Sequence, residues 1–229
     1  MEPRFKAIAD HALLVKFADD ASVEAHTCVI ALDRAIASDP PVGMIETVPA
    51  LVNLLVTFDP VLTDHLAVEG HVRKCLKGLK VEEIAGVRRH IQVCYEASFA
   101  PDLEAVASAT GLSTDAVINA HLAGDYHVLM YGFSPGYAYL SGVTEEIQVP
   151  RKPAPIRDVP AGSVIIAGPQ CLITTLTMPT GWSIIGRSPN AIFTGDATHP
   201  FLFDVGDNVT FERVDLATFE RLSKDIDHG

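Results

Sequence analysis

Long apolar segments are absent from this 229-residue sequence, whose longest unbroken apolar run covers only residues 28–32. A helix that spans a bilayer needs about 20 predominantly apolar residues, so the sequence predicts no membrane span. Residues 1–6 also lack the apolar core of a secretory signal peptide. From these absences we expect a cytoplasmic protein that does not act on a membrane.

Cysteine is scarce as well, since the four cysteines are scattered and form no CxxC pair. Nine histidines are present, but HExxH and related zinc motifs do not occur among them. Scattered cysteines in a reducing compartment are typically reduced and buried. We therefore expect neither a disulfide framework nor a metal site.

Phosphate-binding glycine loops are also missing. The sequence contains no G-x-x-x-x-G-K-[ST] pattern and no G-x-G-x-x-G that opens a helix. Both patterns hold nucleotide phosphates through backbone N–H groups. If the protein uses ATP, this chain does not hold it by a standard phosphate loop.

Basic residues are outnumbered, with 17 against 29 acidic residues and a net charge of −12. Such a charge repels nucleic acid and anionic membranes. Residues 102–122 resemble a helix-turn-helix with a break at Gly111, but the second helix, 114–122, has no lysine or arginine for phosphate contacts. We interpret this helical pair as a connector and expect no nucleic-acid partner.

The first 95 residues alternate between two apolar periods. Period-two runs predict strands at 13–17, 44–48, 53–58 and 88–95, and helical spacing predicts helices over 25–36 and 68–79. The resulting order, β-α-β-β-α-β, is that of the ferredoxin-like, split βαβ arrangement. We expect a ferredoxin-like domain in residues 1–88.

Short apolar runs separated by glycine and proline dominate residues 89–229. They predict strands at 128–131, 164–167, 172–177, 183–185, 191–193 and 209–214. Many short strands with frequent turns are typical of a β-barrel or sandwich. The predicted fold class is therefore α+β, with a β-rich second domain that includes the helical pair at 101–122 and ends in a helix at 216–226.

The segment Gly132-Phe133-Ser134-Pro135-Gly136 matches the G-x-S-x-G nucleophile elbow of serine hydrolases. Asp158 or Asp196, followed by His199, would complete the chain order of a triad. In an elbow the residue after the nucleophile donates its backbone N–H to the oxyanion hole, and Pro135 has no N–H. We therefore interpret the segment as a tight Pro-Gly turn.

Glycine, proline, aromatic and arginine residues are concentrated between Tyr131 and Arg187. Such a set can form an apolar pocket with a few polar groups for a small carboxylate, amide or phosphate, and arginine suits a planar anion. The alternative is a set of barrel corners around a hydrophobic plug. We predict that six residues bind substrate: Tyr137, Tyr139, Arg151, Gln170, Trp182 and Arg187. We predict that seven others shape the loops: Gly132, Pro135, Gly136, Pro160, Gly162, Gly181 and Gly186.

The blocks at 131–140, 149–152, 159–170 and 181–187 occur in an order that resembles the family called allophanate hydrolase subunit 1, or KipI-like. This resemblance implies a ferredoxin-like N-terminal domain followed by a cyclophilin-like β-barrel. It also implies an enzyme of several subunits. The partners would be a second barrel protein (allophanate hydrolase subunit 2, or the C subunit of 5-oxoprolinase) and an A subunit of the lactam-utilisation type.

The function that the resemblance implies is that of one component of an ATP-dependent hydrolase that opens a cyclic amide, as the B subunit of 5-oxoprolinase is. ATP, with Mg²⁺, would be used by the whole complex, and the partner chains would supply the catalytic base. Two alternatives stay open: a carboxyltransferase component of a urea carboxylase-type enzyme, and a non-catalytic inhibitor of a sensor histidine kinase. Residues 171–176 depart from the usual Thr-Gly-Ile-Tyr-Pro-like run of the family, so the substrate also stays open.

Overall fold

The computed structural model describes residues 2–79 and 86–227, with side chains as far as residue 224. The chain divides into two compact units, Met1–Ile84 and Ala85–Gly229, each with its own buried apolar residues. The division predicted from the sequence lies four residues later, after residue 88. No helix in the described part of the chain is long and apolar enough to cross a membrane.

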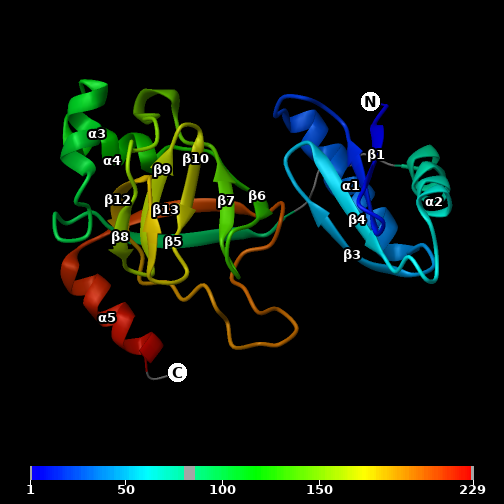
Figure 1. Ribbon diagram of the computed structural model, residues 1–229. Coiled ribbons are helices and arrows are strands. Elements are labelled where there is room, and N and C mark those ends of the chain that lie inside the picture. The colour runs from blue at the N-terminus through cyan, green and yellow to red at the C-terminus, as the bar shows by residue number, and fades with distance from the viewer. Residues whose placement is uncertain (1, 80–85, 228–229) are drawn as a thin grey trace. The chain divides into compact units, whose positions relative to one another are not determined.

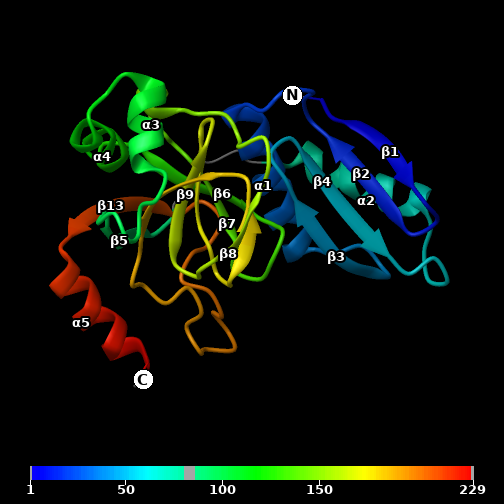
Figure 2. The ribbon, with the colours of Figure 1, turned by 60° about the vertical axis from the view of Figure 1, so that its left-hand side comes forward.

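The first unit is a four-stranded antiparallel sheet in the order β1-β2-β4-β3, with both of its helices on one face (Figures 1 and 2). Its elements are β1 (Arg4–Ile8), β2 (Ala12–Lys16), α1 (Val23–Ser38), β3 (Met44–Pro49), β4 (Asn53–Phe58) and α2 (His65–Lys77). Leu13 of β2 and Val56 of β4 lie opposite each other and are buried. The side chains of Ser22 and Asp64 cap the two helices, which fixes where each helix begins.

The strand predicted at 88–95 does not belong to this sheet. Both edges of β2 are occupied, by β1 on one side and by β4 on the other. β5 (Arg88–Cys94) pairs instead with strands of the second unit. The predicted β-α-β-β-α-β order was therefore wrong in its last strand, because the unpredicted β1 forms a local hairpin with β2 and fills that edge. The ferredoxin-like domain stays a prediction.

The second unit contains a closed barrel of seven strands in the order β10-β7-β6-β13-β5-β12-β9 (Figure 1). β13 runs parallel to β5, and their register places Asn208 opposite Arg88. The barrel strands are β5, β6 (Tyr126–Tyr131), β7 (Ala138–Ser141), β9 (Ser163–Ala167), β10 (Gln170–Ile173), β12 (Ser183–Arg187) and β13 (Asn208–Val214). A separate two-stranded sheet pairs β8 (Ile156–Val159) with β11 (Met178–Thr180). The predicted barrel is confirmed.

The helices of this unit follow the sequence closely. The predicted pair is confirmed as α3 (Leu103–Thr110) and α4 (Thr114–Leu122), which pack against each other, and α5 (Leu216–Asp227) follows the last strand. A short 3-10 helix covers Glu145–Ile147. The strand predicted at 191–193 was wrong, since Phe193 makes only an isolated bridge to Phe201. Strands β7, β8 and β11 were not predicted.

Apolar side chains are buried on both faces of the barrel wall. Leu140, Val164 and Ile166 belong to the cluster inside the barrel, whereas their strand neighbours Ile165 and Ala167 belong to a second cluster. Side chains alternate along a strand, so the second cluster lies on the outer face of the barrel. We call it the outer-face cluster; its members are Tyr137, Val159, Ile165, Ala167, Leu172, Met178, Trp182 and Ile184. Since β8 and β11 contribute members, the two-stranded sheet covers it.

One polar network lies inside the barrel around His121, which is fully buried. Its Nδ1 atom is 2.7 Å from the Tyr95 hydroxyl, and its Nε2 atom is 3.6 Å from the Cys171 Sγ atom. Burial lowers the pKa of His121 to about 3 and raises the pKa of the Cys171 thiol. Both groups are therefore neutral near pH 7. The network satisfies buried polar atoms and does not supply a reactive thiolate.

Candidate functional site

Three of the six residues predicted to bind substrate meet at the outer-face cluster. The ring centroids of Tyr137 and Tyr139 are 5.6 Å apart, and those of Tyr139 and Trp182 are 6.1 Å apart, both edge to face. Tyr137 and Trp182 are each only 5% exposed. Burial, with a smaller contribution from Tyr139, raises the pKa of Tyr137 to about 12. Such burial favours a packing role for these two rings.

Arg151 lies over this cluster, with its Cζ atom 5.3 Å from the centroid of the Trp182 ring. The next residue fixes the local backbone, because the N–H of Lys152 donates to the Gly181 carbonyl at 2.6 Å. The Lys152 Nζ atom also forms an ion pair with Asp102 at 2.5 Å. This anchoring holds the exposed Arg151 guanidinium against the tryptophan face, a cation–π arrangement.

Gln170 is the first residue of β10 and lies opposite Ser141 of β7. It shares its strand face with Leu172, a member of the outer-face cluster. The structure thus brings Arg151 and Gln170 to the side of the barrel that carries the predicted aromatic residues. Arg187 is the sixth predicted residue, and it lies elsewhere.

An open cavity of about 470 Å³ surrounds Arg187, and we call it the Arg187 cavity. Six residues that define it are Gly162, Thr175, Arg187, Asn190, Ile192 and Phe219. Arg187 is the one charged residue among the described side chains that line the cavity. Within the described chain, no three His, Cys, Asp or Glu residues gather in a way that could hold a metal ion. The single positive charge of Arg187 makes the cavity suitable for an anion.

Arg187 is held at one end of its side chain and free at the other. Its Nε atom donates to the Ala161 carbonyl at 3.2 Å, and its Cζ atom lies 5.7 Å from the ring centroid of Phe99. Its terminal nitrogens form no hydrogen bond or ion pair with any described residue. A guanidinium fixed in this way keeps paired donors available for a planar anion.

The loop at Gly162 forms one wall of the Arg187 cavity. Gly162 has a φ of +80°, and a side chain built there would bring its Cβ atom within 2.6 Å of the Ser188 carbonyl oxygen. The Ser188 N–H donates to the Gly162 carbonyl at 2.8 Å, while the Pro160 carbonyl accepts from nearby hydroxyls. Gly186 lets β12 approach β5, since a Cβ atom there would lie 2.6 Å from Val93. Pro160 and Gly162 in the loop fix the backbone near Arg187, and so does Gly186, which was predicted to shape a loop but lies within β12.

The turn at 132–137 is the predicted Pro-Gly turn, which is confirmed. The N–H of Tyr137 donates to the Ser134 carbonyl at 3.1 Å, so Pro135 and Gly136 occupy the two central positions. Gly136 has a φ of +70°, as the second central residue of a type II turn requires. Gly132 closes the hairpin by donating to the Tyr137 carbonyl at 3.1 Å.

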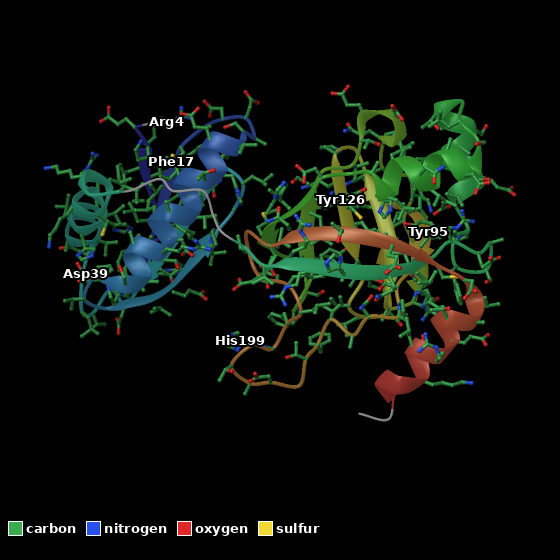
Figure 3. All side chains as sticks on the ribbon, turned by 180° about the vertical axis from the view of Figure 1, so that it is seen from behind. Arg4, Phe17, Asp39, Tyr95, Tyr126 and His199 are labelled. Atoms are coloured by element: carbon green, nitrogen blue, oxygen red, sulfur yellow. The ribbon has the colours of Figure 1, made fainter. Side chains whose placement is uncertain are left out.

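Ser134 does not have the surroundings of a nucleophile. Its Oγ atom is 3.2 Å from the Thr175 Oγ1 atom, and no described histidine hydrogen-bonds to it. Asp196 and His199, two of the three candidate triad partners, both interact with Thr198 on the long loop between β12 and β13. Figure 3 shows His199 on this loop. The Ser134–Thr175 pair instead links the turn to the wall of the Arg187 cavity.

The predicted site residues therefore divide into two groups along β12. Trp182, which Arg151 contacts, precedes this strand, and Arg187 is its last residue. Five residue steps in a strand cover roughly 16 Å, so the two arginines lie near opposite ends of β12. We predicted one site for Arg151 and Arg187 only because the sequence motifs that contain them are close in the chain.

Sequence reasoning missed several residues that line the Arg187 cavity, including Thr175 and Asn190. Neither residue belongs to a recognisable motif. Asn190 follows Arg187 by three positions, so its proximity to a predicted arginine was the one available signal.

Comparison with known proteins gives consistent matches over most of the chain. The family model described as carboxyltransferase domain, subdomain C and D, matches residues 3–203. The B subunit of 5-oxoprolinase from Bacillus subtilis (strain 168) is 35% identical over 223 residues, which cover 92% of this chain and 92% of that protein.

Solved structures extend the comparison. The crystal structure of TTHA0988 matches with a TM-score of 0.79 and 35% identity, over 90% of this chain and 40% of that one. This chain therefore spans less than half the length of that relative. The urea carboxylase of Kluyveromyces lactis matches with a TM-score of 0.82 and 16% identity, over 99% of this chain and 23% of that one. At so low an identity the match shows a shared fold alone.

Proposed function

Because this chain belongs to the carboxyltransferase domain family, subdomains C and D, we propose that it is the B subunit of an ATP-dependent 5-oxoprolinase. One observation carries this proposal: the match to a curated 5-oxoprolinase B subunit extends over 92% of both chains. The reaction would open the lactam ring of 5-oxoproline to give glutamate, coupled to hydrolysis of ATP. The chain would act only within a complex.

The Arg187 cavity is our proposal for the part of the substrate site that this chain contributes. It is open, its described lining carries a single positive charge, and the terminal nitrogens of Arg187 have no described partner. A carboxylate such as that of 5-oxoproline would satisfy them with paired hydrogen bonds. The carboxyl group would then hold the lactam at the mouth of the cavity, where a partner chain could reach it.

The remaining predicted residues have a supporting role in this proposal. Tyr137 and Trp182 would stabilise the barrel wall through the outer-face cluster, and Tyr139 would lie at its margin. Arg151 and Gln170, on the same side, would bind substrate only if the partner chain brought the ligand there. We retain the ferredoxin-like and cyclophilin-like domain assignments as part of the same proposal.

ATP and Mg²⁺ are assigned to the complex and not to this chain. The sequence has no phosphate-binding glycine loop. The partners would be the second barrel protein (the C subunit of 5-oxoprolinase) and the lactam-utilisation-type A subunit, which would also supply the catalytic base. The cytoplasmic location stays a prediction of the sequence.

The test is to co-express this chain with those two partners, purify the complex, and measure ATP-dependent release of glutamate from 5-oxoproline. Arg187→Ala should lower kcat/KM about 10- to 150-fold, because a hydrogen bond to a charged group contributes about 1.5–3 kcal/mol. Arg187→Lys should recover part of the loss, since lysine keeps the charge but not the paired donors. A well-folded wild-type complex without turnover would contradict the proposal.

A second candidate, a carboxyltransferase component, is favoured by the description of the matching family model. It predicts that the purified complex has no 5-oxoprolinase activity but transfers a carboxyl group to urea or a related amide when paired with a biotin-dependent carboxylase. The kinase-inhibitor alternative predicts binding to a histidine-kinase dimerisation domain in a pull-down. Loss of turnover in Arg187→Ala without any kinase binding would exclude that alternative.

A further inference from the structure

Asn190 lines the Arg187 cavity together with Arg187 and belongs to the segment that follows β12. Its side-chain oxygen, Oδ1, accepts two hydrogen bonds. One comes from the backbone N–H of Gln92 at 3.0 Å, and the other comes from the Ser188 hydroxyl at 2.9 Å. The Asn190 N–H in turn donates to the Ser188 hydroxyl oxygen at 3.1 Å. The amide group is therefore fixed in one orientation.

This orientation determines which atom is left without a partner. A backbone N–H can only donate, so the atom that faces Gln92 must be the oxygen and not the nitrogen of the amide. The amide nitrogen, Nδ2, carries two N–H donors, and neither forms a hydrogen bond with a described residue. No buried side-chain nitrogen or oxygen in the described chain lacks a hydrogen-bond partner, so this unpaired nitrogen is not a buried atom.

The other groups of the cavity define what these donors would bind. The terminal nitrogens of Arg187 are a second set of donors without a described partner, and the Thr175 hydroxyl is a third possible donor. No described lining residue is acidic, and Ile192 and Phe219 provide apolar wall. Fixed donors, one positive charge and apolar walls are the features of a site for a small monoanion.

We propose that Asn190 is a specificity-determining residue that donates from Nδ2 to the same carboxylate that Arg187 binds. The inference rests on the proposed function, in which that carboxylate belongs to 5-oxoproline. A flat carboxylate would accept the paired hydrogen bonds from the guanidinium, and one of its oxygens, which has a further lone pair, would also accept from the amide nitrogen. The resulting arrangement selects a compact ring that carries one negative charge.

A matched pair of variants separates this role from a structural one. In Asn190→Asp, one carboxylate oxygen can still accept from Gln92 and Ser188, while the other replaces the amide nitrogen with a negatively charged acceptor. The structural bonds are kept, and the donor to the ligand is lost. Asn119→Asp adds the same charge on the exposed face of α4, which does not line the cavity, and controls for net charge.

The experiment measures KM and kcat for 5-oxoproline in the purified complex, with the thermal unfolding midpoint of each variant. Asn190→Asp should raise KM about tenfold or more, leave kcat within about twofold, and leave the unfolding midpoint nearly unchanged. Asn119→Asp should leave all three unchanged. If the wild-type complex is active and Asn190→Asp has a KM within about twofold of wild type, the role of Asn190 is overturned while the proposed function stands.

If the wild-type complex shows no turnover, the proposed function fails, and a binding experiment still decides the role of Asn190. The labelled full chain is titrated with cyclopentanecarboxylate, a compact monoanion without an amide, and followed by NMR. Weaker binding to Asn190→Asp than to wild type supports the assignment. Equal binding, or no binding to the wild-type chain, overturns it.

Discussion

The outer-face cluster and the Arg187 cavity lie near opposite ends of β12, and they differ in what their side chains contact. In the cluster, Tyr137 and Trp182 are almost fully buried against apolar neighbours and a covering two-stranded sheet. In the cavity, Arg187 and Asn190 are fixed by a few hydrogen bonds and keep donors without described partners.

The difference separates residues that stabilise the barrel from residues that can bind a ligand. Buried aromatic rings contribute mainly to the free energy of folding. Fixed donors without partners add little to folding, but they are available to a ligand without further ordering of the side chain. Residue types alone do not make this distinction, because arginine and aromatic residues are typical of both kinds of region.

The largest effect on the free energy of unfolding is expected from a substitution at Trp182 in the outer-face cluster. Trp182→Ala should lower the free energy of unfolding by about 3–5 kcal/mol, because it removes a large buried ring and leaves a cavity. Urea denaturation measures the change. Phe133→Ala is the matched control, because the ring centroids of Phe133 and Tyr137 are 5.5 Å apart but Phe133 is 75% exposed. This variant should change the free energy of unfolding by only about 0.5 kcal/mol. If Trp182→Ala lowered the free energy of unfolding by less than about 1 kcal/mol, the outer-face cluster would not have the stabilising role assigned to it.

A smaller effect is expected at the cavity wall. Gly162→Ala should cost about 2–3 kcal/mol of unfolding free energy, from the positive φ and from the close approach of the new Cβ atom to Ser188. Gly168→Ala is the matched control, because Gly168 has a φ of +52° and nothing within 4 Å of an added Cβ atom. The control should therefore lose only the conformational part, about 1 kcal/mol. Equal losses in the two variants would show that the contact with Ser188 does not shape the cavity.

Titration offers a third test, which concerns burial in the barrel interior, where His121 contacts Tyr95 and Cys171. Burial lowers the pKa of His121 to about 3 from an ordinary value of 6.5. Between these values the unfolded chain binds a proton that the folded chain does not, so stability must fall as the pH falls. At pH 5 the loss due to His121 should be about 2 kcal/mol relative to pH 7.

Urea denaturation at the two pH values measures this loss. His121→Gln should reduce the difference between pH 7 and pH 5, because it removes the buried imidazole. A variant at His121 with the same pH dependence as wild type would show that this residue is not sealed inside the barrel.

The smallest effect is expected at Arg151. Arg151→Ala should cost only about 0.5–1 kcal/mol of unfolding free energy, because an exposed cation–π contact with Trp182 contributes little. Arg157→Ala, a change at another exposed arginine, is the control and should cost less. A loss above about 2 kcal/mol would mean that Arg151 is an integral part of the outer-face cluster.

The helices and the Pro-Gly turn were predicted because each depends on local patterns. The short strands predicted a barrel or a sandwich, and the family resemblance implied the barrel. The period-two pattern predicted the strand at 88–95, observed as 88–94, but this strand was assigned to the wrong sheet because its partners are distant: Arg88 lies opposite Asn208 in a parallel pair. The same pattern failed at β1, where the alternating signal is weak because most of its side chains are exposed. Pairing between distant strands is set by the whole barrel and cannot be found from period alone.

The candidate site shows a similar limit. Arg187 and Gly162 were predicted, because glycine and arginine near a predicted strand end suggest a loop with a binding function. Asn190 was not, since its importance depends on which amide atom faces Gln92. Arg151 and Arg187 were predicted to share one pocket, because no sequence pattern shows that Arg151 contacts Trp182 before β12 while Arg187 ends this strand.

One measurement tests the central claim most directly, namely the crystal structure of the complete complex with 5-oxoproline bound. The ligand carboxylate should lie in the Arg187 cavity, within hydrogen-bond distance of the terminal nitrogens of Arg187 and of the Asn190 amide nitrogen. A carboxylate bound instead to Arg151, against the face of Trp182, would contradict the assignment and make the outer-face cluster the substrate site.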